Sequence, residues 1–203
     1  MAQKTFVNPI ELKKDRIRII DQTKLPVVLS YEDCRSVSDV WQAIKKLKVR
    51  GAPLIGIAGA LGFFLGMQKT KAKDYEALLK EAGELEAYLN SSRPTAVNLS
   101  WSLSLMFDVV KSAKGCLKRE ILLLLKKEVE RIIHEDIQMC FQMSEHGSRL
   151  IKSEDRLLTV CNAGGLATSG YGTALGVFYR AKEEGKRIKV YACETRPLLQ
   201  GAV

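Results

Sequence analysis

The sequence has few of the residues that build disulfide scaffolds, zinc ribbons or metal centres. Its 203 residues include five cysteines and two histidines, and the cysteines form no Cys-x-x-Cys pair. An odd set of separated cysteines argues against a disulfide framework and against a zinc ribbon. His134 and His146 lack the His-Glu-x-x-His spacing of zinc enzymes. We therefore expect no metal site.

The first residues also lack the apolar core of a secretory signal. Together with the unpaired cysteines, this leads us to expect a cytoplasmic protein. Residues 52–67 carry no charge, but they are fewer than the ~20 apolar residues that cross a bilayer. We interpret them as a buried helix and expect no membrane contact.

Positive charge is in excess but is not concentrated in one segment. Lys and Arg number 32 against 23 Asp and Glu, which gives a formal net charge of +9. On one predicted helix, Lys126 and Lys127 are followed by Glu128 and Glu130, whereas nucleic-acid modules gather basic and aromatic residues on one face. We interpret this pattern as a solvated helix surface and expect no nucleic-acid partner. The surplus charge would still favour an anionic substrate such as a phosphate.

Residues 1–150 have the pattern of a small β element followed by a helical bundle. Residues 17–20 and 26–29 are predicted as short strands, and helices are predicted from Ser36 onward, with Ser36 or Ser38 as a cap. The longest helix carries an apolar stripe at helical spacing, which we expect to lie in the core. Its members are Leu122, Leu125, Val129, Ile132, Ile133, Ile137, Cys140 and Phe141.

Residues 151–203 have the pattern of a βαβ unit. An apolar run ends at Cys161, a glycine-rich loop follows, a helix is predicted to about Glu184, and residues 188–192 form a second predicted strand. Such strands are parallel and neighbouring. We therefore predict an α/β protein in which the N-terminal β and helical domain precedes an incomplete Rossmann-like domain. Because two parallel strands leave a sheet uncovered, we expect a fragment; completion of the sheet by a partner is the alternative.

Cys161 is the candidate for chemistry at the carboxyl end of the first strand of this unit. Ligands of open α/β sheets bind at that edge, and the amides of a following helix stabilise a nearby anion. A small buried cysteine is the alternative interpretation. The glycines at 170, 172 and 176 do not have the spacing of a dinucleotide-binding loop, so we expect no nicotinamide cofactor.

Two arginines precede helices that are too apolar to lie on the surface. Arg50 stands before Gly51, Ala52 and Pro53, and Arg93 stands before a second apolar helix. Free N–H groups at 51 and 52 beside a guanidinium are typical of an anion site. Two interpretations remain open from the residues alone: the two arginines share one phosphate, or each only marks a loop.

Four motifs, in order along the chain, carry a resemblance to a known family. They are Arg50-Gly-Ala-Pro53, Ser92 to Asn98, Cys161-Asn-Ala-Gly164 with Ser169 to Gly176, and Glu194 to Gly201. They resemble the family that the methylthioribose-1-phosphate isomerases share with the alpha, beta and delta subunits of translation initiation factor 2B. The resemblance implies a cytosolic homodimer that acts in methionine salvage on a sugar phosphate, without metal or organic cofactor.

The resemblance also implies a role for individual residues. Cys161 corresponds to the catalytic cysteine, and the substrate contacts correspond to Arg50, Gly51, Ala52, Arg93 and Gln200. The implied reaction converts 5-methylthioribose 1-phosphate to 5-methylthioribulose 1-phosphate. A ribose-1,5-bisphosphate isomerase and a non-catalytic initiation-factor subunit are the alternatives. Cys193 stands where the family usually has an acid, and the family's catalytic Asp would fall beyond residue 203, in agreement with the expected fragment.

Overall fold

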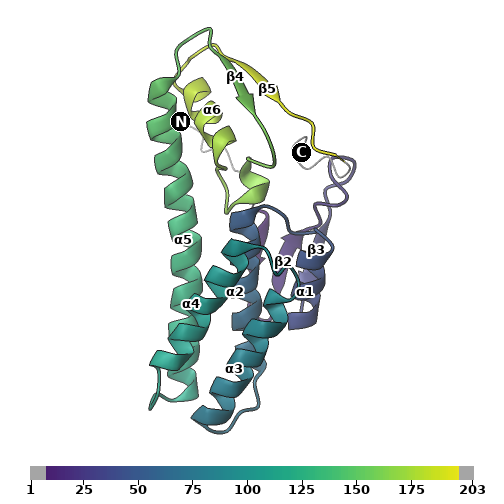
Figure 1. Cartoon of the computed structure of the whole chain (residues 1–203), viewed down its shortest axis with the longest axis vertical. Coiled ribbons are helices and arrows are strands. Elements are labelled where there is room, and N and C mark those ends of the chain that lie inside the picture. The colour runs from purple at the N-terminus through teal and green to yellow at the C-terminus, as the bar shows by residue number, and fades with distance from the viewer. Residues whose placement is uncertain (1–7, 197–203) are drawn as a thin grey trace.

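The computed structural model describes residues 8–196. A small antiparallel sheet and a bundle of helices carry a two-stranded parallel sheet at one end (Figure 1). The elements in chain order are β1 (Ile10–Leu12), β2 (Ile17–Ile20), β3 (Tyr31–Cys34), α1 (Val37–Lys45), α2 (Ala52–Lys69), α3 (Tyr75–Asn90), α4 (Val97–Ser112), α5 (Lys118–Leu150), β4 (Arg156–Thr159), the 3-10 turn η1 (Gly165–Ala167), α6 (Ala174–Glu183) and β5 (Lys189–Ala192). The predicted α/β class, with a small β element, helices and then a parallel sheet, is confirmed.

The N-terminal sheet has the order β1-β2-β3, with both pairs antiparallel. The strand predicted at residues 17–20 is confirmed as β2, but the strand predicted at residues 26–29 is wrong. That segment is a turn, because the amide of Val28 donates to the carbonyl of Lys24 at 3.0 Å, and Val27 is 88% exposed. The partner strand β3 begins only at Tyr31.

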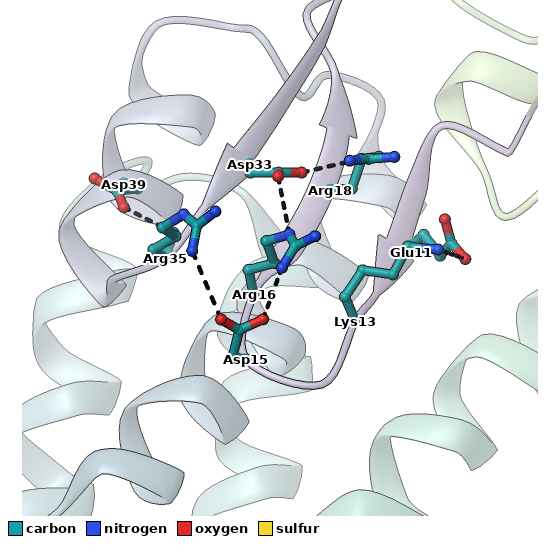
Figure 2. A network of polar contacts seen from close by, with 8 residues as sticks. All are labelled: Glu11, Lys13, Asp15, Arg16, Arg18, Asp33, Arg35 and Asp39. Atoms are coloured by element: carbon teal, nitrogen blue, oxygen red, sulfur yellow. Dashed lines mark hydrogen bonds and ion pairs between the residues drawn. The ribbon is translucent and has the colours of Figure 1, made fainter.

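Ion pairs connect the residues around β2 and β3 on the surface of this sheet (Figure 2). Asp33 lies 2.9 Å from both Arg16 and Arg18, and Asp15 lies 2.9 Å from Arg16 and 3.6 Å from Arg35. The hydrogen bond from Arg18 holds the pKa of Asp33 below its usual value. Exposed ion pairs contribute at most about 1 kcal/mol each to the free energy of unfolding. This network therefore orients the ends of the strands and adds little to the stability of the fold.

Helix α2 is the centre of the hydrophobic core. Pro53 stands in its first turn, where a missing N–H costs nothing. Within residues 8–196 it is the one helix whose length and composition would suit a bilayer, and 78% of that stretch is buried inside the protein. The predicted buried helix is confirmed. Gly56 allows α4 to approach closely, since a Cβ added there would lie 2.8 Å from the carbonyl oxygen of Asn98.

The apolar stripe predicted on α5 is confirmed in its first half and at Cys140. Leu125, Val129, Ile132 and Cys140 are buried, but Ile137 and Phe141 are 40% and 42% exposed, so their predicted core positions are wrong. The buried positions of the second half are small residues, namely Cys140, Ser144 and Ser148. The physical reason is that α6 packs closely here: a Cβ added to Gly147 of α5 would lie 2.7 Å from Val177 of α6, so small side chains leave room for α6.

The predicted βαβ unit is confirmed: β4 and β5 are parallel neighbours, and α6 crosses between them. In the apolar run of the first strand of this unit, the side chains of Leu158 and Val160 are 72% and 66% exposed. The predicted domain boundary near residue 150 coincides with the end of α5. Because α6 packs against the same helix, the division into domains 1–150 and 151–203 stays a prediction.

Candidate functional site

The site is where the start of α2 meets the loop between β4 and α6 (Figure 1). Arg50, 4% exposed, immediately precedes Gly51, the N-cap of α2. Gly51 has φ +101° and ψ 132°, and a Cβ added to it would lie 2.5 Å from Cα and Cβ of Ala167. The first motif is therefore packed directly against the loop that follows Cys161.

A buried glutamine joins the same two segments. Gln22, 1% exposed, accepts a hydrogen bond through Oε1 from Nε of Arg50 at 3.3 Å. Its Nε2 donates to the carbonyl oxygen of Leu166 at 2.7 Å. Sequence analysis missed Gln22, because its partners lie 28 and 144 residues away along the chain. The only sequence signal is a polar residue directly after an apolar strand.

The start of α2 has the electrostatic character of an anion site. Burial lowers the pKa of Arg50 from its ordinary value, since the protein interior disfavours the charged form. Gln22 is a neutral partner, so this bond orients the guanidinium without cancelling its charge. Among residues 8–196, no side chain caps α2, and the orphan N–H groups of a first turn stabilise negative charge. Anion binding at Gly51 and Ala52 stays a prediction.

Arg93 lies on the neighbouring helix start, before α4, and is half-buried. Its backbone forms the turn into α4, with the amide of Ala96 donating to its carbonyl at 3.0 Å. Among residues 8–196, no recorded hydrogen bond or ion pair joins its side chain to Arg50 or to Cys161. The structure thus brings Arg50 and Gly51 to the loop, but sharing of one phosphate by both arginines stays a prediction.

Cys161 is exposed and has φ +72°, a left-handed conformation that is uncommon outside glycine and often marks functional positions. The amide of Cys193 donates to the carbonyl of Thr159 at 2.9 Å, so the ends of β4 and β5 share one edge. At the start of α6, the amides of Thr173 and Leu175 donate to the carbonyl of Ala163 at 3.0 and 3.3 Å. These two amides hold the loop, and stabilisation of the thiol by helix amides stays a prediction.

The loop is held by polar contacts that the sequence did not indicate. Oγ1 of Thr168 accepts hydrogen bonds from the amides of Gly170 and Gly172, each at 3.2 Å. Asp136 on α5 accepts one from the amide of Ser169 at 2.7 Å. A Cβ added to Gly172 would lie 2.7 Å from the carbonyl carbon of Gly164. These glycines therefore allow the loop to pack closely against itself.

Two hollows lie near these elements. One hollow of about 170 Å³ lies between α2, α4 and α5, and its lining includes Pro53, Asn98, Trp101 and Asp136. A larger one of about 880 Å³ lies between α6 and β5 and does not include Cys161. Within the described part of the chain, no group of three or more His, Cys, Asp or Glu could hold a metal ion. Gln200, the remaining predicted contact, lies outside the described residues.

Comparison with known proteins identifies the family of these motifs. The Initiation factor 2 subunit family matches residues 48–203. The chain belongs to this family. Its members therefore share the segment that contains Arg50, Arg93 and Cys161.

Individual relatives are isomerases of sugar phosphates by name. The chain is 44% identical over 196 residues to the methylthioribose-1-phosphate isomerase of Desulforamulus reducens, a match that covers 97% of the chain and 57% of that protein. It is 46% identical over 196 residues to the 5-deoxyribose 1-phosphate isomerase of Moorella thermoacetica, covering 97% and 56%. The crystal structure of 5-methylthioribose 1-phosphate isomerase from Pyrococcus horikoshii matches with a TM-score of 0.90 and 34% identity, covering 98% and 55%. The chain spans about half the length of the curated relatives it matches.

Proposed function

We propose that the protein is an aldose–ketose isomerase that converts 5-methylthioribose 1-phosphate to 5-methylthioribulose 1-phosphate in methionine salvage. The observation that carries the proposal is the junction at the start of α2, where Gly51 packs on Ala167 and Gln22 joins the buried Arg50 to Leu166 in the loop that follows Cys161. The names of relatives that are 44% and 34% identical support the choice of reaction.

The proposed reaction moves one hydrogen from C2 to C1 of the sugar, while the phosphate stays on O1. In ring opening, the C1–O4 bond breaks and O4 takes a proton from a general acid. The C2–H bond then breaks, a C1–H bond forms, and the C2 hydroxyl gives its proton to a base as it becomes the carbonyl. Two groups of different proton affinity must therefore face the substrate.

Cys161 is proposed as one of these two groups, because its left-handed backbone and exposure present the thiol at the strand edge where ligands bind. Arg50 and Arg93 are proposed to bind the phosphate, together with the amides of Gly51 and Ala52. Gln200 is proposed as a further substrate contact. In this scheme the phosphate compensates the buried charge of Arg50.

A second candidate substrate is 5-deoxyribose 1-phosphate, which the name of the Moorella thermoacetica relative favours. The two sugars differ only in the substituent on C5, a methylthio group or a hydrogen. Both undergo the same reaction at C1 and C2, so the proposed roles of Cys161 and Arg50 are common to both.

The proposed working form is a cytoplasmic homodimer without metal or organic cofactor, in which residues 151–203 begin a Rossmann-like domain. Apolar side chains exposed on α5, among them Met139 (59%) and Leu123 (60%), support an assembly that covers them. Light scattering on the purified protein tests this: a dimer mass is expected, and a monomer at micromolar concentration contradicts it.

The reaction is tested with the protein expressed from its complete gene and each of the two sugar phosphates. Proton NMR should show the aldose signal at C1 replaced by that of a ketose. Cys161→Ser should abolish turnover, whereas Cys116→Ser, at an exposed cysteine outside the site, should leave it unchanged. Absence of turnover with both sugars refutes the proposed function.

A further inference from the structure

Gln22 stands at a junction of three segments. Its backbone amide donates to the carbonyl of Lys48 at 3.1 Å, and its side chain contacts Arg50 and Leu166 as described above. It therefore touches the connection before α2, the buried arginine and η1 of the loop at the same time. At 1% exposure, its amide group has no access to bulk water that could replace these partners.

The backbone around Gln22 is fixed independently of these side-chain bonds. The preceding residue, Asp21, is 4% exposed and accepts a hydrogen bond from the amide of Thr23 at 3.1 Å and another from its hydroxyl at 2.5 Å. The amide of Asp21 donates to the carbonyl of Ser30 at 2.9 Å. The turn after β2 thus gives Gln22 a rigid base, as the aspartate turns of many loops do.

The chemistry of the junction requires a neutral group with both an acceptor and a donor. Nε of Arg50 can only donate, and the carbonyl of Leu166 can only accept; a primary amide satisfies both at once. A carboxylate in the same place would accept from Arg50, but it could not donate to Leu166. It would also neutralise the charge that an anionic substrate needs.

We propose that Gln22 is a positioning residue: it orients Arg50 and fixes the loop after Cys161 relative to it, without reducing the positive charge of the site. This inference rests on the proposed function for its catalytic readout. Gln22 itself does not touch the reacting atoms in this scheme. It sets the geometry between the phosphate-binding arginine and the loop that carries the proposed catalytic thiol.

The decisive variant is Gln22→Glu in the protein expressed from its complete gene. At pH 8.5 the introduced carboxylate should lower kcat/KM by about tenfold to a hundredfold, the range expected when a buried bond is lost and a charge opposes the substrate. Beside the guanidinium of Arg50 the introduced carboxylate stays ionised from pH 6 to pH 8.5, so it offers no donor to Leu166 in this range. The ratio of kcat/KM between variant and wild type should therefore stay low and nearly constant over these pH values.

Two further variants separate positioning from folding. Gln22→Leu removes both bonds without adding a charge, so its loss of kcat/KM should be smaller than that of Gln22→Glu. Thr70→Val is the matched control: Thr70 is also buried and hydrogen-bonded, to the amide of Ala72 at 3.1 Å. It lies at the other end of the 18-residue α2, about 27 Å from the site at 1.5 Å per residue, and should keep wild-type kinetics.

The outcomes distinguish this inference from the proposed function. If wild type converts the sugar and both Gln22 variants stay within twofold of it at all pH values, the positioning role is wrong and the isomerase stands. If wild type converts neither sugar, the isomerase is wrong, and calorimetric titration with inorganic phosphate then decides about Gln22. Weaker phosphate binding by Gln22→Glu than by wild type, with Gln22→Leu between them, supports the inference; equal binding by all three overturns it.

Discussion

Replacing Gly51 with alanine tests the contact between α2 and the loop that follows Cys161. Gly51 combines φ +101° with ψ 132°, a conformation that costs a residue with a Cβ about 1–3 kcal/mol. The added atom would also lie 2.5 Å from two carbon atoms of Ala167 and 2.8 Å from its carbonyl oxygen. Overpacking of this kind costs about 1–3 kcal/mol more. The free energy of unfolding should therefore fall by about 2–6 kcal/mol.

The matched control is Gly115→Ala, because Gly115 has φ +89° and nothing within 4 Å of an added Cβ. It should lose about 1–2 kcal/mol from the left-handed backbone alone. Guanidinium unfolding of both variants, followed by circular dichroism, measures the difference. Hydrogen exchange should also accelerate at the amides of Gly170 and Gly172 if the loop moves away from α2. Equal destabilisation by the two substitutions, with unchanged exchange in the loop, would refute the close packing of Gly51 on Ala167.

Three other predictions concern the arginines and the cysteines. Arg50→Ala or Arg93→Ala should lower kcat/KM by the equivalent of about 2–4 kcal/mol, since each loses a charge-assisted contact with phosphate; unchanged steady-state kinetics would remove that arginine from the site. Iodoacetamide should modify Cys161 in the native protein at pH 8, more slowly with substrate present, and should spare the buried Cys34 and Cys140, as peptide mass spectrometry would show; protection of Cys161 without substrate would contradict its exposure. Burial raises the pKa of Cys34 to about 12, and burial with the nearby Asp136 carboxylate raises the pKa of Cys140 to about 11. The free energy of unfolding should therefore keep its full value below pH 9 and fall above pH 9, as the thiols of the unfolded chain ionise. Cys140→Ser should flatten this decline in denaturant titrations from pH 8 to pH 11, and an unchanged slope would argue against the raised pKa.

Local signals in the sequence were sufficient for much of the fold. Ser36 caps α1 and accepts a hydrogen bond from the amide of Asp39 at 3.1 Å, and Gly185, with φ +81°, ends the segment after α6. The uncharged run of α2 indicated a buried helix without any knowledge of its partners. Each of these features depends on residues within a few positions of one another, which is the range over which sequence patterns act.

The errors arose where tertiary packing decides. Both halves of α5 are apolar at helical spacing, and Cys140 is buried as predicted, but the second half otherwise buries Ser144 and Ser148 instead of Ile137 and Phe141. Hydrophobicity alone favours the larger residues, whereas the approach of α6 requires the smaller ones. The bonds of Gln22 were missed for a related reason: a polar residue after a strand has no signature for partners far along the chain.

The buried charge of Arg50 connects the fold to the proposed chemistry. A guanidinium in an apolar core is costly unless it is hydrogen-bonded and meets negative charge. The protein supplies the neutral amide of Gln22 at 3.3 Å, which orients the cation, and it places the uncapped start of α2 beside it. Both features favour an anion beside Arg50. Gln22 bonds Arg50 and also reaches the loop after Cys161 through Leu166, so we expect phosphate binding at Arg50, as proposed, to be coupled to the geometry of the proposed catalytic thiol.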